Sequence, residues 1–232
     1  MVVGVFVALA VLGAIAAVVV LLLQRGRETL DLSLRGLLRV YLYLASLAGV
    51  IVFTIGLAGV LSFGLAAAFG RDVIYGGPVP VPVPAIAPAC PPNQPNCVQP
   101  PIPFRPIEDE RERRQQDDLV SGITFMTFGG VFWLAHWMAR RTLVATAERA
   151  SGLFRAYLML GTVMFGIATI VLLPTGIYQA LSSALITANP NAFRQGAGDA
   201  LPGGLASLPL WLTYLWLVLR SIRAPAVPVA VA

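Results

Sequence analysis

The stretch GLLRVYLYL at residues 36–44 returns as GLFRAYLML at residues 152–160, and this repeat decides the expected fold. Six of the nine positions are identical, among them a glycine, an arginine and a tyrosine. Each stretch opens a long apolar segment, followed by a loop and a tryptophan-rich segment that ends in arginines. These second segments are FWLAHWMARR (132–141) and WLTYLWLVLRSIR (211–223), in which Trp137 and Trp216 align. We infer a duplicated helical hairpin.

The composition places this hairpin pair in a membrane. Of 232 residues, 57% are hydrophobic and only 12% are charged, whereas soluble proteins carry about 25% charged residues. A membrane-spanning helix needs about 20 apolar residues, and five segments qualify. The sequence therefore predicts an all-α polytopic membrane helical bundle with five transmembrane helices, an N-terminal span plus two duplicated hairpins, at residues 2–23, 37–69, 119–138, 153–186 and 205–219.

The first apolar segment could also be a signal peptide. It lacks a basic N-terminal region, and its apolar run exceeds the roughly 7–15 residues usual in signal peptides. Its basic flank, Arg25 and Arg27, follows the segment. We expect an uncleaved span with the N-terminus outside.

The arginines set the orientation, because cytoplasmic flanks of spans carry the excess of basic residues. All 16 basic residues are arginines. With the linkers 24–35 and 142–151, the tail 224–232 and the arginines of the adjoining helix ends inside, that side holds 10 arginines and three acids, against six arginines and eight acids outside. We expect a multi-pass protein of a bacterial inner membrane with a cytoplasmic C-terminus. The expected hairpin repeats cover residues 36–141 and 152–223. Basic runs interleaved with aromatics are missing, which disfavours nucleic acid as a partner.

A polar loop at 70–118 interrupts the first hairpin on the outside. Twelve of the 18 prolines fall between Pro78 and Pro106, so this part should be extended; it would act as a stiff spacer or as a strap that docks a partner. Residues 107–118 should extend the third span as a solvated helix. Cys90 and Cys97 could form a disulfide in an oxidising compartment or remain two free thiols. A separate functional alternative is an outer-face sensor that reads redox state through this pair.

Several residues are candidates for contacts at the membrane surface. Arg39 and Arg155 lie one turn into their spans, where an arginine can reach the headgroups, and Tyr41 and Tyr157 suit an aromatic belt. A functional alternative is that these four residues bind an anionic ligand or a lipid headgroup. The other interfacial candidates are His136, the only histidine, with Trp137 and Trp216.

The second span carries small residues, which let helices approach closely. We expect them to serve packing within the chain in preference to an oligomer contact. They are Ala45, Gly49, Gly56, Gly59 and Gly64.

Residues for catalysis are not evident. The middle of each span contains no ionisable residue, and motifs for nucleotide, serine-hydrolase or zinc-protease chemistry are missing. We predict no catalytic residue, no metal site and no cofactor.

The pattern R-x-Y-L-x-L at the start of one span, followed by a span ending in His136-Trp137 and Arg140-Arg141, resembles an uncharacterised bacterial family of multi-pass membrane proteins, a domain of unknown function. The resemblance covers about residues 36–223 and implies no particular activity or ligand. The proline-rich loop with its two cysteines departs from the pattern.

These features favour a non-enzymatic integral membrane protein, a scaffold or accessory subunit of a membrane assembly. Its expected partners are membrane lipids and other membrane protein subunits or further copies of itself. The alternative is a small transporter or lipid-binding module that uses a pseudo-symmetric cleft between the two hairpins.

Overall fold

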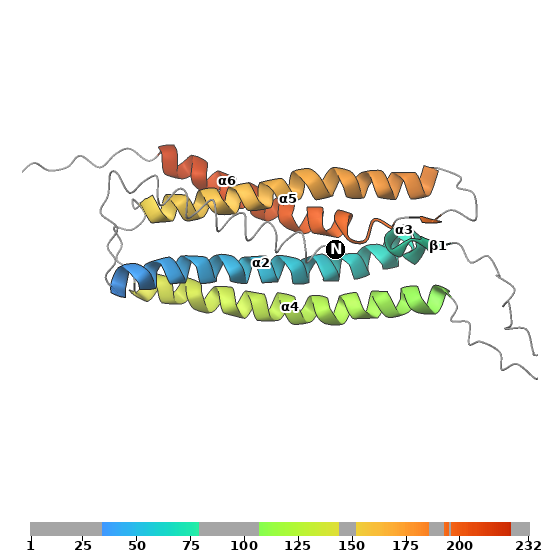
Figure 1. Cartoon of the computed structure of the whole chain (residues 1–232), viewed down its shortest axis with the longest axis horizontal. Coiled ribbons are helices and arrows are strands. Elements are labelled where there is room, and N and C mark those ends of the chain that lie inside the picture. Colours follow the sequence, from blue (N-terminus) through green and yellow to red (C-terminus); the bar gives the residue numbers. More distant parts are fainter. Residues whose placement is uncertain (1–33, 79–106, 144–151, 186–192, 195, 224–232) are drawn as a thin grey trace, which may run out of the picture.

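The computed structural model describes residues 34–78, 107–143, 152–185, 193–194 and 196–223, and within them the protein is all-α. Four long helices lie side by side (Figure 1). Each is long and apolar enough to cross a membrane. The helices are α2 (Leu34–Phe69), α4 (Ile107–Leu143), α5 (Gly152–Leu185) and α6 (Ala200–Arg223).

The predicted second to fifth spans are all helical, and the helix of the fifth span is longer than expected. The helix α4 begins at Ile107, which confirms that residues 107–118 extend the third span. Asp118 therefore lies inside a continuous helix. The helix α6 begins at Ala200, before the expected start at Leu205. The predicted first span, residues 2–23, lies outside the described residues.

Glycines bring α2 and α4 into close contact. A Cβ atom on Gly122 would lie 2.7 Å from the amide nitrogen of Val60 and 3.0 Å from the carbonyl oxygen of Gly56. A Cβ on Gly49 would lie 2.8 Å from the backbone of Trp133. These distances are too short for any side chain, so only glycine permits this approach. The expected intrachain packing is thus confirmed for Gly49, Gly56 and Gly59, whereas Gly64 has no such neighbour within 4 Å.

The second pair of long helices packs in the same way. A Cβ on Gly204 of α6 would lie 2.7 Å from the Leu173 backbone of α5, and one on Gly166 would lie 2.8 Å from the Trp211 indole nitrogen. Deeper in the interface, the Thr169 hydroxyl donates a hydrogen bond to Ser207, and both residues are buried. Each helical hairpin is therefore held together by its own close interface.

The helix α2 is the centre of the bundle, since it packs against α3, α4, α5 and α6. Its inward face repeats every four residues, as a helix buried along one side should. Every member of that face is at most 7% exposed. The face consists of Ser46, Val50, Thr54, Ala58 and Ser62.

A small cap, not expected from the sequence, closes the end at which α2 stops. Gly70 and Gly76, both at positive φ, flank the short helix α3 (Arg71–Tyr75). The two-residue strands β1 (Gly77–Pro78) and β2 (Phe193–Arg194) pair antiparallel beside it. The Gly198 amide donates to the Ile74 carbonyl at 2.7 Å, and the Gly198 carbonyl accepts from the buried Ser62 hydroxyl at 2.9 Å. The cap thereby joins the first hairpin to the second.

Charges separate between the two ends of the bundle. The ends where α2 and α5 begin and α4 and α6 finish lie together (Figure 1), and we call them the arginine-rich end. Within the described residues this end carries no acid. Its arginines in the described helices are Arg35, Arg39, Arg140, Arg141, Arg155, Arg220 and Arg223. The opposite end, with the cap, we call the acidic end. It carries every acid of the described residues: Asp72, Glu108, Asp109, Glu110, Glu112, Asp117, Asp118 and Asp199.

Candidate interfacial site

Three tyrosines from three helices meet at the arginine-rich end. The hydroxyls of Tyr157 on α5 and Tyr214 on α6 share a buried hydrogen bond of 2.7 Å. The ring of Tyr43 on α2 lies 5.2 Å from that of Tyr157, and Phe165 stacks on Tyr214 at 5.7 Å. All four side chains are at most 8% exposed. This tyrosine cluster forms the main core of the bundle and joins the two hairpins at this end.

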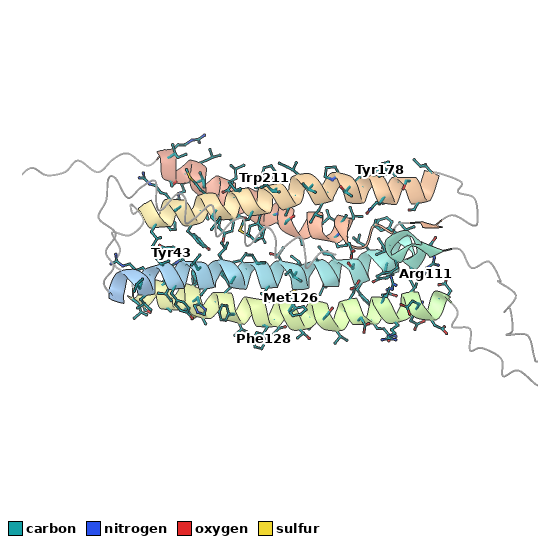
Figure 2. The ribbon with its side chains drawn as sticks, in the orientation of Figure 1. Tyr43, Arg111, Met126, Phe128, Tyr178 and Trp211 are labelled. Carbon is teal, nitrogen blue, oxygen red and sulfur yellow. The ribbon has the colours of Figure 1, made fainter. Side chains whose placement is uncertain are left out.

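Arg140, near the end of α4, lies against this cluster. Its guanidinium carbon is 4.8 Å from the centre of the Tyr43 ring and 5.2 Å from that of Tyr157, which are favourable cation–π distances. Its Nη1 atom is enclosed and has no hydrogen-bond partner. The hydroxyl of Ser46, one turn along α2 from Tyr43, is likewise enclosed without a partner. Figure 2 shows Tyr43 on the side of α2 that faces the second hairpin.

The two tyrosines expected in an aromatic belt occupy different surroundings. Tyr41 is 56% exposed, and its hydroxyl lies 3.3 Å from Nε2 of His136. Tyr157 is buried inside the bundle. The other ring nitrogen of His136, Nδ1, lies 2.8 Å from the Phe132 carbonyl oxygen, so His136 has a partner on both sides.

Each of the two aligned tryptophans has an arginine guanidinium over its ring. The guanidinium carbon of Arg141 lies 3.7 Å from the Trp137 ring, and that of Arg220 lies 5.4 Å from the Trp216 ring. In both pairs the arginine follows the tryptophan by four residues, one helical turn. A tryptophan and an arginine stacked at a helix end suit the boundary between lipid and water.

Arg39 and Arg155 both lie at the arginine-rich end with exposed side chains. The structure brings Tyr157 into contact with the tyrosine cluster and Tyr41 into contact with His136. The proposed joint binding of an anion by Arg39, Arg155, Tyr41 and Tyr157 stays a prediction. Cys90 and Cys97 lie outside the described residues.

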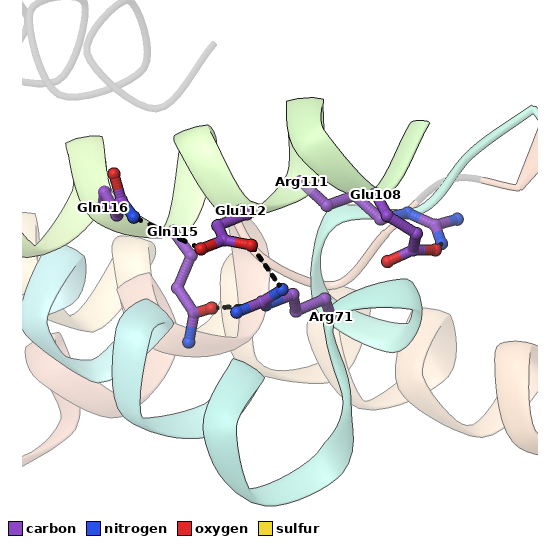
Figure 3. A network of polar contacts seen from close by, with 6 residues as sticks. All are labelled: Arg71, Glu108, Arg111, Glu112, Gln115 and Gln116. Atoms are coloured by element: carbon purple, nitrogen blue, oxygen red, sulfur yellow. Dashed lines mark hydrogen bonds and ion pairs between the residues drawn. The ribbon is translucent and has the colours of Figure 1, made fainter. Parts of the chain in front are cut away.

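At the acidic end, a polar network fastens α3 to the first turns of α4 (Figure 3). Arg71 donates to Gln115 at 2.7 Å and to Glu112 at 3.3 Å. Gln115 is buried and also donates to the Phe63 carbonyl of α2 at 3.3 Å. Arg111 donates to the Gly76 carbonyl at 3.0 Å and pairs with Glu108 at 2.7 Å. These bonds use the side chains of the polar helix extension to hold the cap.

A tyrosine–aspartate pair completes this attachment. The Tyr75 hydroxyl donates to a carboxylate oxygen of Asp118 at 3.0 Å. Burial raises the pKa of Tyr75 well above its ordinary value, and the nearby negative charge of Asp118 raises it further. The phenol therefore stays protonated and remains a donor throughout the physiological pH range.

Comparison of the chain with protein-family models, curated proteins and solved structures gives no match. Within the described ranges, no group of three or more His, Cys, Asp or Glu side chains is placed to hold a metal ion.

Sequence reasoning missed the part that Arg140 and the tyrosine cluster play. Arg140 resembles the neighbouring Arg141 in sequence, as both end the same span. Only the three-dimensional packing shows that Arg140 faces the second hairpin while Arg141 stacks on its own helix.

Proposed function

We propose that the protein is an integral membrane scaffold or accessory subunit, built from two duplicated hairpins and an N-terminal span. The observation that carries this proposal is the one-sided packing of α4. Apart from Arg140, which reaches Tyr157 of α5, this helix packs mainly on α2 and, at the acidic end, on α3. Its opposite face is apolar and open, with Phe128 73% and Val131 64% exposed. Figure 2 shows Phe128 on the side of α4 away from α2. In a membrane such a face meets lipid or another protein.

The register of the two helix pairs supports the duplication. The repeated stretches are 116 residues apart, and Trp137 and Trp216 are 79 apart. Adding these offsets to the contact between Val60 and Gly122 gives Gly176 and Leu201. A Cβ on Gly176 would overlap the backbone of Leu201, so this pair is also in close contact. Both helix pairs therefore have a close approach at this register, although the glycine lies on the opposite helix of the pair.

Two further correspondences support the same register. Phe53 and Gly129 are in contact, and adding the same two offsets to their numbers gives positions within one residue of Thr169 and Ser207, which are hydrogen-bonded to each other. The offset of the second helices also aligns Arg141 with Arg220, and each of these arginines stacks on a tryptophan of its own helix. Two hairpins with one orientation and one register favour a pseudo-twofold axis along the membrane normal.

The separation of charge supports the orientation. We propose that the arginine-rich end is cytoplasmic and the acidic end lies outside, in a bacterial inner membrane. The helix α4 has 37 residues, or roughly 55 Å at 1.5 Å per residue, against a hydrocarbon core of about 30 Å. Its polar first turns and the attached cap would then project from the outer surface.

Photo-crosslinking in native membranes tests the scaffold role. A photoreactive residue in place of Phe128 should give protein adducts, because this side chain points away from the chain's own helices. The matched control is Met126, which lies at the interface with α2 and should crosslink only within the chain.

The adducts identify the partner as a second copy or as another membrane protein. Adducts to lipid alone from Phe128, together with a lone monomer in native mass spectrometry, would contradict the scaffold role.

A further inference from the structure

The two hairpins meet through two different helix faces. We call the face of α2 that packs on the second hairpin the leading face; it consists of Tyr43, Leu47 and Ile51. We call the face of α5 that packs on the first hairpin the receiving face; it consists of Tyr157, Leu160 and Met164. These side chains share one apolar cluster, in which the rings of Tyr43 and Tyr157 lie 5.2 Å apart. The interface between the hairpins therefore has two unlike sides.

Each of these faces has a counterpart on the other hairpin. The repeated stretches at 36–44 and 152–160 are 116 residues apart, so this offset leads from a residue of α2 to its counterpart on α5. The counterparts of the leading face are Met159, Val163 and Ile167 of α5. The counterparts of the receiving face are Tyr41, Leu44 and Ala48 of α2. If the two hairpins made equal contacts, these counterparts would be buried as well.

All six counterparts are exposed instead. Tyr43 of the leading face is 5% exposed, whereas its counterpart Met159 is 55% exposed. Tyr157 of the receiving face is 8% exposed, whereas its counterpart Tyr41 is 56% exposed. An exact twofold axis would bury each face and its counterpart alike, so the pseudo-twofold relation is incomplete. The chain therefore leaves open both sides of a second interface equivalent to the one between its own hairpins.

We propose that these open faces bind a second copy of the chain, head to tail. The Met159 face of one copy would pack on the Tyr41 face of the next, as the leading face packs on the receiving face within each chain. Such a contact is heterologous, and it repeats from copy to copy into a ring or a row. Copies in one membrane share one orientation, which this contact requires, and apolar helices associate there through close packing. The inference rests on the proposed duplication and names the partner of the proposed scaffold.

Disulfide crosslinking of the full chain in native membranes tests this contact. In a Cys90→Ser, Cys97→Ser background, chains with Met159→Cys are co-expressed with differently tagged chains that carry Tyr41→Cys. These two positions take the places of Tyr43 and Tyr157, so oxidation should join the two chains. Met138→Cys in place of Tyr41→Cys is the matched control, because Met138 is 53% exposed and lies near the same end of the bundle on α4. The control should give at least about tenfold less product, since a disulfide needs Cα atoms within about 7 Å.

A chain that carries both Met159→Cys and Tyr41→Cys shows whether the contact repeats. Because each copy then presents both sides, oxidation should give trimers and larger products, whereas either single variant alone should remain monomeric. Crosslinking of Met159→Cys to itself, with products that stop at the dimer, would show an isologous contact and overturn the proposal. Equal product from the pair and from the Met138→Cys control would also overturn it, since these faces would then meet lipid or another segment of the chain.

Crosslinking from Phe128 reads the scaffold role separately, because Phe128 lies on α4 outside both open faces. Protein adducts from Phe128 without a crosslink between Met159→Cys and Tyr41→Cys would overturn self-association and leave the scaffold role standing. Lipid adducts alone from Phe128, with that crosslink present, would support self-association and remove α4 as a docking face.

Discussion

Adding a single methyl group to Gly56 should destabilise the protein, because the close approach of α2 and α4 leaves no room for it. A Cβ at this position would overlap the amide nitrogen of Met126 and lie 2.7 Å from the Gly122 carbonyl oxygen. Non-bonded heavy atoms attract best at roughly 3.5–4.0 Å. The two helices must therefore separate by about 1 Å at their closest point.

The expected cost follows from overpacking a close interface. Added methylene groups in a packed core cost about 1–3 kcal/mol. The higher helix propensity of alanine offsets up to about 1 kcal/mol of this. Gly64→Ala, in the same helix, meets nothing within 4 Å and should gain that propensity without a clash.

Thermal unfolding in detergent, followed by circular dichroism, measures the difference. At roughly 2–4 °C per kcal/mol for a chain of this size, Gly56→Ala should lower Tm by several degrees, while Gly64→Ala should leave it unchanged or raise it. Equal Tm values for the two variants would refute the close packing of α2 on α4.

Other substitutions test the two ends of the bundle. Tyr157→Phe leaves the buried Tyr214 hydroxyl without its partner and should cost about 1–2 kcal/mol in chemical unfolding; Tyr41→Phe, at an exposed bond, should cost less than about 0.5 kcal/mol. Arg71→Ala removes the bonds to Gln115 and Glu112 and should speed amide hydrogen exchange in α3, whereas the exposed Arg113→Ala should not. Unchanged exchange after Arg71→Ala would show that the polar network does not hold the cap. Gly204→Ala should lower Tm much as Gly56→Ala does, since the second hairpin packs through its own glycine; an unchanged Tm would contradict that similarity.

The sequence predicts the four described long helices well because their signals are local. Runs of apolar residues, the polar helix extension at 107–118 and the glycines of α2 can all be read directly from the chain. The cap cannot, since α3 has five residues and its stability depends on bonds to distant groups such as Gln115 and Gly198. Such contacts leave no periodic pattern.

The packing of the candidate site could likewise not be predicted from the sequence. The repeated arginines and tyrosines mark the correct end of the bundle, but not which side chain faces the interior. Tyr41 and Tyr157 occupy the same repeat position, yet one is exposed and one is buried. On α5 this position faces Tyr43 and Tyr214. On α2 the residue that faces α5 is Tyr43, two positions after Tyr41.

The central claim is that the bundle crosses a membrane with its arginine-rich end inside, and cysteine labelling tests it most directly. In a Cys90→Ser, Cys97→Ser background, Arg113→Cys and Thr142→Cys would place single thiols at exposed positions near opposite ends of α4. A membrane-impermeant maleimide applied to intact spheroplasts should label the first thiol and reach the second only after permeabilisation. Labelling of both thiols without permeabilisation, or of Thr142→Cys alone, would contradict the account.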